Sequence, residues 1–192
     1  AADEVDMFYE TVGDFVDIVE GIGWERSEVA SAATIVIRPN QLAEVDGATP
    51  YADKRVRQAI AMAVDPAVLL ELGYSNRGAV ARNQHVGPMH PAWADVPALP
   101  YDPAKALEML TEAGLADFEM EVSKVDDDWR QNTTAAVVAQ LQDAGFNAKH
   151  TVIPGSTFWN DWTKYPFSST NWNHRPLDTQ ILGLAYRSGE AW

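Results

Sequence analysis

The sequence has 192 residues, of which 46% are hydrophobic and 22% are charged, so it predicts a globular chain with a substantial core, of one domain or one and a fraction, and argues against general disorder. Its formal net charge is −14, because 28 acidic residues oppose 14 basic ones, and this balance argues against binding to nucleic acid or to an anionic membrane. The chain has no cysteine, which excludes disulfides, thiolate metal sites and a cysteine nucleophile.

The two ends of the sequence indicate either that a signal peptide has been removed or that the chain is an excerpt, and we expect an excerpt of a longer chain. No run of about 18 apolar residues occurs, so no membrane-spanning segment is predicted. The first residues lack the basic and apolar regions of a signal peptide, and the last ones stop just after an apolar segment. The absence of cysteine is compatible with export without proving it.

The first third of the chain predicts helices around one strand. Residues 5–19 place apolar side chains at helical spacing across Gly13, which predicts a kinked helix or two short ones. Residues 32–37 are β-branched or small and predict a short buried strand. An apolar helical face then runs from residue 56 to residue 64, with Asp53 as its N-cap, and Asp65-Pro66 begins a second short helix.

Residues 75–101 show little periodicity and contain four prolines, which predicts a long loop with a functional or docking role. Asp102-Pro103 then begins a helix that ends at Gly114. The remainder alternates between strands and helices, with strands at 118–122, 148–153 and 167–172 and helices after Asp126-Asp127-Asp128 and near 156–164. The pattern predicts an α/β fold whose neighbouring strands are parallel and joined by right-handed crossovers.

The stretch Thr49–Asp65 reads TPYADKRVRQAIAMAVD and is similar to a family pattern, P-[FY]-x-D-x-R-V-R-Q-A-[IL]-x-x-A-[IV]-D. This pattern is found in bacterial extracellular solute-binding proteins of family 5, the receptors of peptide, nickel and opine ABC transporters. Tyr101–Gly114, which reads YDPAKALEMLTEAG, resembles a second block of the same family, and Val138–Phe146 resembles a third. Residues 1–7 are similar to the acidic segment before the family's hinge strand, whereas Ile37-Arg38-Pro39 departs from the family's l-x-F-N.

The resemblance implies a mixed, partly parallel sheet with flanking helices, as in one lobe of a class II periplasmic binding protein. Residues 1–40 are then expected to form the first-lobe edge and hinge strand, and residues 41–192 the second ligand-binding lobe, truncated at its C-terminal end. The opposite wall of the ligand cleft would lie outside this sequence, so the chain alone is expected to bind weakly or not at all.

The same resemblance implies a transport receptor and no enzyme. The chain would capture a small solute, by default a di- or oligopeptide, and deliver it to the permease subunits of an ABC importer in the periplasm, as a monomer without a cofactor. Sugars, opines and nickel chelates remain open as ligands. The alternatives are a ligand-sensing or chaperone-like receptor and a metal-dependent hydrolase.

The candidate ligand-binding residues lie in the last 35 positions, where eight aromatic side chains gather: Phe158, Trp159, Trp162, Tyr165, Phe167, Trp172, Tyr186 and Trp192. The segment Asn171–Asp178 is similar to the G-W-x-x-D of peptide-binding relatives, whose Asp receives the peptide amine. Trp172 would stack on the ligand or pack in the core, Arg175 would pair with a carboxylate, and Asp178 would meet an amine or cap the next helix. Asn173, His174 and Tyr186 complete the candidate set.

Catalytic and metal-binding patterns are not found in the sequence. His85 and His90 share no helical face, and the other two histidines lie far from them, so no zinc spacing is present. Asp126-Asp127-Asp128 lacks the spaced oxygen ligands of a calcium loop and suits the start of a helix. No G-x-S-x-G or G-x-G-x-x-G occurs either.

Overall fold

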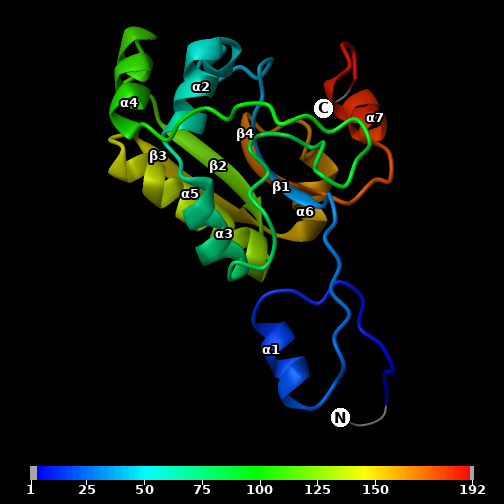
Figure 1. The fold of residues 1–192 in the computed structure, drawn as a ribbon. Helices are drawn as coiled ribbons and strands as arrows, with labels where there is room; N and C mark the ends of the chain where they lie inside the picture. Colours follow the sequence, from blue (N-terminus) through cyan, green and yellow to red (C-terminus); the bar gives the residue numbers. More distant parts are fainter. Residues whose placement is uncertain (1–3, 191–192) are drawn as a thin grey trace.

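The computed structural model describes residues 4–190, apart from the side chains of Asp14, Asp128 and Trp129, and contains one four-stranded mixed sheet (Figure 1). The spatial order of the strands is β1-β4-β2-β3. β4 pairs antiparallel with β1 and parallel with β2, which in turn pairs parallel with β3. The strand bounds are β1 Thr34–Pro39, β2 Met120–Val125, β3 Ala148–Ile153 and β4 Phe167–Trp172.

Helices cover both faces of this sheet. α5 packs across β2, β3 and β4 on one face and in turn contacts α3, while α2 pairs with α4. α6 lies on the other face, where Gly155 approaches Val125 of β2. The helix bounds are α1 Asp14–Gly21, α2 Lys54–Met62, α3 Pro66–Tyr74, α4 Pro103–Glu112, α5 Asp128–Asp143, α6 Gly155–Asp161 and α7 Asp178–Ile181, with a 3-10 turn at Pro50–Ala52 and a π-helical turn at Leu182–Tyr186.

Aspartate side chains cap three of the helices, as the sequence predicts for α2 and α3 and as Asp102-Pro103 predicts for α4. Asp53 accepts a hydrogen bond from the N–H of Arg55 at 2.8 Å, and Asp65 accepts one from Ala67 at 2.9 Å. Asp102 accepts from Lys105 at 2.9 Å. Each bond satisfies a first-turn N–H that has no partner inside its helix.

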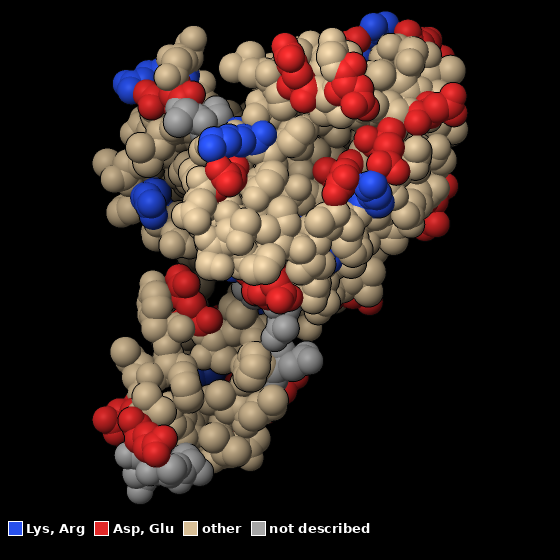
Figure 2. Space-filling view, turned by 180° about the vertical axis from the view of Figure 1, so that it is seen from behind, with Lys and Arg blue, Asp and Glu red and all other residues tan. Residues whose placement is uncertain are grey.

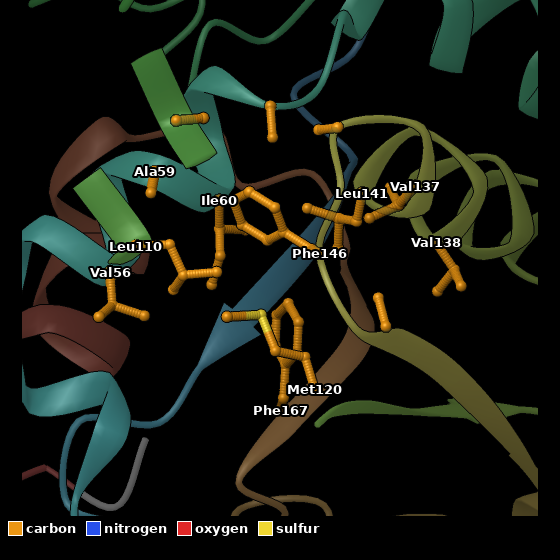
Figure 3. Close-up of a cluster of buried hydrophobic side chains, with 14 of the residues drawn as sticks. Val56, Ala59, Ile60, Leu110, Met120, Val137, Val138, Leu141, Phe146 and Phe167 are labelled. Carbon is orange, nitrogen blue, oxygen red and sulfur yellow. The ribbon is translucent and has the colours of Figure 1, made fainter. Parts of the chain in front are cut away.

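The core lies between the α5 face of the sheet and the α2–α4 pair. Figure 3 shows side chains from both helices and from α5 converging on the strands. The predicted apolar faces of these helices are confirmed, since Val56, Ala59, Leu110 and Leu141 are fully buried. α3 approaches α5 so closely that a Cβ on Gly73 would lie 2.0 Å from the Thr133 hydroxyl oxygen.

Three elements differ from the sequence-based expectations. β1 begins two residues later than predicted and is mostly half-buried, because it is an edge strand with a neighbour on one side only. Pro39 can end it because an edge strand tolerates a missing N–H. β2 also begins two residues late, and all of its residues but Glu121 are buried, because it lies between two strands and under helices on both faces.

The prediction of helix across residues 5–19 is wrong for residues 5–12, which form neither helix nor strand. α1 begins only after Gly13, whose φ of 61° is incompatible with a right-handed helix. This N-terminal segment extends away from the sheet (Figure 1), and its apolar side chains, such as Phe15 and Ile18, are more than half exposed. Arg77 fastens it to the end of α3 through an ion pair with Asp17 at 2.7 Å.

We expect Leu110→Ala to lower the free energy of unfolding by about 2–5 kcal/mol, because the substitution leaves a cavity in a fully buried contact between α4 and α2. Urea denaturation measures the change. The matched control is Leu42→Ala, at a side chain that is 88% exposed, where the change should stay within about 0.5 kcal/mol. Equal effects of the two substitutions would contradict the assigned core.

Candidate ligand-binding site

The candidate site lies at the carboxyl ends of the parallel strands β2 and β4. After β2 the chain enters α5 on one face of the sheet, and between β3 and β4 it passes through α6 on the other face. The segments that leave the carboxyl ends of β2 and β4 are therefore the start of α5 and the chain that leads to α7, and α6 begins beside them at the carboxyl end of β3. In open α/β sheets, ligands usually bind outside the carboxyl ends of the strands.

Five ring side chains form a continuous series along this edge, which we call the aromatic row: Trp159, Trp162, Trp172, His85 and Tyr186. The centroids of the successive rings lie 6.3, 6.3, 6.0 and 5.3 Å apart. Nε2 of His85 and the hydroxyl of Tyr186 form a hydrogen bond of 2.7 Å. Mutual edge-to-face and tilted packing holds the rings in place, and such rings can stack on the apolar or planar parts of a ligand.

A polar chain runs beside the aromatic row. The Arg130 guanidinium pairs with Asp127 at the start of α5 and donates a hydrogen bond to the side-chain oxygen of Asn171. The Asn171 amide then donates to Asn173 at 3.2 Å. Arg130 also lies 5.6 Å from the ring centre of Trp159, which joins the polar chain to the aromatic row by a cation–π contact.

His174 and Arg175 connect three segments behind this edge. His174 accepts a hydrogen bond at Nδ1 from the N–H of Ala32, just before β1, and its ring stacks on His90 at 6.2 Å. His90 accepts from the N–H of Gly87 and donates from Nε2 to the carbonyl of Arg175, which fixes its ring as the Nε2–H tautomer. The loop of residues 75–101 is thus fastened to the chain that follows β4.

Arg175 itself is half-buried, and its guanidinium donates to the carbonyl of His174 at 3.1 Å. Among the described residues no carboxylate forms an ion pair with it. Asp178 forms no ion pair with Arg175, and its carboxylate has other partners. One oxygen of Asp178 accepts from Thr179 in the first turn of α7, and the other accepts from Ala92 at 3.2 Å.

Arg38 supports the site from β1. It is buried and donates to the carbonyls of Trp162 and Thr163, both at 3.1 Å, just after the end of α6. These bonds hold Trp162 in the aromatic row. Burial lowers the pKa of Arg38 and raises the pKa of Tyr186, while the positive charge of Arg38 opposes the shift at Tyr186.

Three of the six candidates from the sequence lie on the aromatic row or on the polar chain beside it. Trp172 and Tyr186 belong to the aromatic row, and Asn173 ends the polar chain. His174 and Arg175 form the connection to Ala32 and His90, and Asp178 begins α7. Of the other aromatics, Phe158 and Phe167 are fully buried, Tyr165 packs on Phe158, and Trp192 lies outside the described residues.

Sequence reasoning missed His85, Arg130 and Asn171. His85 stands in a loop without periodicity, so nothing in the sequence indicates that it meets residues about a hundred positions away. Arg130 and Asn171 could have been found from a general rule, because both stand at the carboxyl ends of strands predicted to be parallel.

Metal-binding and membrane-spanning features were searched in the described part of the chain. No group of three or more His, Asp or Glu side chains there could hold a metal ion. Within residues 4–190, no helix has the length and the apolar character needed to cross a bilayer.

Comparison with known families finds a match over nearly the whole chain. The model of bacterial extracellular solute-binding proteins, family 5 Middle, matches residues 2–191. No curated protein matches the sequence.

Solved structures with the same fold include the substrate-binding domain of an oligopeptide ABC transporter from Bacillus anthracis, with a TM-score of 0.76 and 20% identity. Listeria monocytogenes OppA bound to peptide has a TM-score of 0.73 and 22% sequence identity. Both matches cover 94% of this chain and 38% of the other. AgaA of A. tumefaciens in complex with agropinic acid has a TM-score of 0.72 and 21% sequence identity. That match covers 84% of this chain and 33% of the other. The chain therefore spans about a third of the length of these structures.

We expect the stability of the fold to decrease as the pH falls below about 6.5, in part because of His85. Burial lowers its pKa in the folded state, so the unfolded chain takes up the proton first. The contribution of His85 to the free energy of unfolding is complete above its pKa in the unfolded chain. It is lost as the pH falls through its lower pKa in the folded state. In urea denaturation at a series of pH values, His85→Gln should reduce the slope of the unfolding free energy against pH below about pH 6.5.

The comparison variant is His150→Gln, because the His150 ring is exposed on the edge strand β3 and its pKa is lowered as well. This substitution should change the slope less than His85→Gln does. A slope that is the same in the unsubstituted protein and in His85→Gln would show that His85 is not buried as described.

Proposed function

Because the chain belongs to the bacterial extracellular solute-binding proteins of family 5, we propose that it forms one lobe of the substrate-binding component of an ABC importer. In this proposal a small solute is captured between two lobes in the periplasm and delivered to the permease subunits. The role is binding and not catalysis. Residues 41–192 would supply one wall of the cleft, and residues 4–40 would lead into the hinge and the edge of the other lobe.

The aromatic row at the carboxyl ends of β2 and β4 is the observation that carries this proposal. It combines rings that can stack on a ligand with polar groups, from Arg130 to Asn173, that can fix its orientation. This combination of apolar surface and a few placed polar groups is what small-molecule sites require. β1 leads to the same edge, since Thr34 is paired with Trp172, so a hinge at the start of β1 would bring the other lobe over the row.

A peptide is the ligand class that we favour. Two of the similar structures are named as an oligopeptide transporter component and as a peptide complex, and a third holds agropinic acid. A peptide offers backbone groups for Asn171 and Asn173 and side chains for the aromatic row. Arg175, which has no carboxylate partner among the described residues, would pair with a carboxylate of the ligand.

A ligand-sensing or chaperone-like receptor is the second candidate, and it would use the same wall. A sensor needs a surface that changes with ligand, and the loop of residues 75–101 supplies one because His85 and His90 fasten it directly to the site. Deletion of the permease separates the two candidates. Uptake should be lost in a transport receptor, whereas a signalling response should persist in a sensor.

The first experiment is a thermal-shift screen of the full-length protein that contains this chain, with dipeptides, oligopeptides, oligosaccharides, opines and nickel chelates. A ligand at about a hundred times its dissociation constant should add roughly 2.7 kcal/mol to the stability and raise the midpoint. We expect the shift to be confined to peptides. A shift confined to another class would identify that class as the ligand in place of peptides. No shift with any class would contradict solute capture.

We expect Arg175→Ala to weaken the binding of a carboxylate-bearing ligand about tenfold or more, because a hydrogen bond to a charged group contributes about 1.5–3 kcal/mol. Isothermal titration calorimetry with a peptide and with its C-terminal amide measures the effect. The amide should bind equally well to the variant and to the unsubstituted protein. The matched control is Arg55→Ala, which removes an exposed arginine from α2. Unchanged affinity of Arg175→Ala for the free carboxylate would exclude this role.

A further inference from the structure

A second cavity, of about 420 Å³, lies at the opposite ends of the strands from the aromatic row. It follows the N-terminal half of β2 on the face that α6 covers further along, because Glu121 and Ser123 alternate with the core residues and lie on the same side as Val125. Two further residues complete its rim: Asp46 in a turn, and Pro166 just before β4.

Two hydroxyl groups at the inner wall of this cavity have no hydrogen-bond partner within the described part of the chain. Tyr51 is 1% exposed and Ser123 is 8% exposed, and both line the cavity. Neither oxygen is enclosed by protein atoms, so each can exchange a hydrogen bond with water for one with an occupant. An occupant with hydrogen-bond donors would satisfy both oxygens.

Three acidic residues line the same cavity: Asp46, Glu119 and Glu121. Lys149 pairs with two of them, at 2.6 Å from Glu119 and 3.4 Å from Glu121. Three negative charges against one positive charge leave a local charge of −2. The hydroxyl of Thr151 donates to Glu121 and lowers the pKa of that carboxyl, which keeps it ionised near neutral pH.

Aromatic rings form the apolar part of the wall. Tyr51 and Phe118 both line the cavity and meet edge to face, with centroids 5.9 Å apart. Rings beside carboxylates suit an organic cation, because the methylene groups can pack on the rings while the charged nitrogen faces the ring or a carboxylate. Figure 2 shows acidic side chains gathered over the upper right of the rear face, the part of the molecule that holds α4 and β3, and this field attracts cations.

We propose that this cavity is a binding site for an aliphatic diamine or a short polyamine, separate from the site at the aromatic row. One ammonium group would lie among the carboxylates of Glu119, Glu121 and Asp46, and the other would donate to the hydroxyls of Tyr51 and Ser123. The two positive charges match the local charge of −2. A divalent metal fits less well, since no described group of three acidic or histidine side chains is placed to ligate one.

The test is isothermal titration calorimetry of the intact chain with 1,4-diaminobutane at low and at physiological salt. We expect saturable binding with one site, weakened by salt, and weaker binding of the monocation n-butylamine. Calcium should neither bind with comparable affinity nor displace the diamine. A diamine that does not bind saturably, or that calcium displaces at equal concentration, would overturn the proposal.

Substitutions distinguish this site from general attraction to an acidic protein. Tyr51→Phe and Ser123→Ala each remove one hydroxyl with little other change in shape, and each should weaken diamine binding about tenfold. Glu121→Gln should weaken it at least as much. The matched control is Glu108→Gln, which removes one exposed negative charge from α4 and should leave the affinity unchanged.

Thermal midpoints of the same variants show whether each one is folded. Equal affinities of Glu121→Gln and Glu108→Gln, in folded proteins, would show that the diamine binds only as a diffuse counterion and would contradict the site. The proposal does not depend on solute capture, so it can fail while the site at the aromatic row stands.

Discussion

The pairing of β4 with β2 is the constraint on which the rest of the structure depends. Parallel neighbours cannot be joined by a tight turn, so the chain must leave the sheet after each strand and return through a helix. α5 takes one face and α6 takes the other, which buries β2 almost completely. The starts of α5 and α6 and the chain after β4 therefore meet at the carboxyl ends of the strands, and these segments carry the aromatic and polar side chains of the candidate site.

The antiparallel pairing of β1 with β4 adds a second consequence. It brings the N-terminal segment to the same edge, because the start of β1 lies beside Trp172 at the end of β4. A change in direction before β1 would therefore be transmitted directly to the aromatic row. Ala32 and His174 form the hydrogen bond at this point, so the entry of β1 and the chain after β4 are held together as one unit.

The sequence predicted the elements well where they depend on interactions between residues that are close in the sequence. β3 and β4 begin and end where the sequence indicates, and Asp53 and Asp65 cap the helices that their sequence context predicts. Burial was harder to predict. The alternating pattern predicts a half-buried β2, and Glu121 is exposed as expected, but the other residues of β2 are buried because helices from distant parts of the sequence cover both faces. The N-terminal helix was overestimated, since helical spacing of apolar residues forms a stable helix only where another surface covers it.

The candidate site was predictable in part for the same reason. Trp172 and Tyr186 belong to a segment rich in aromatics, whereas His85 reaches them only through the tertiary fold. The loop of residues 75–101 nevertheless has a clear role in the structure. It carries no helix or strand, yet His85, His90 and Ala92 each bond to a different residue after β4. Three separate attachments over eight residues make this loop part of the wall of the candidate site, so under the proposed function its sequence would influence ligand choice together with the strands.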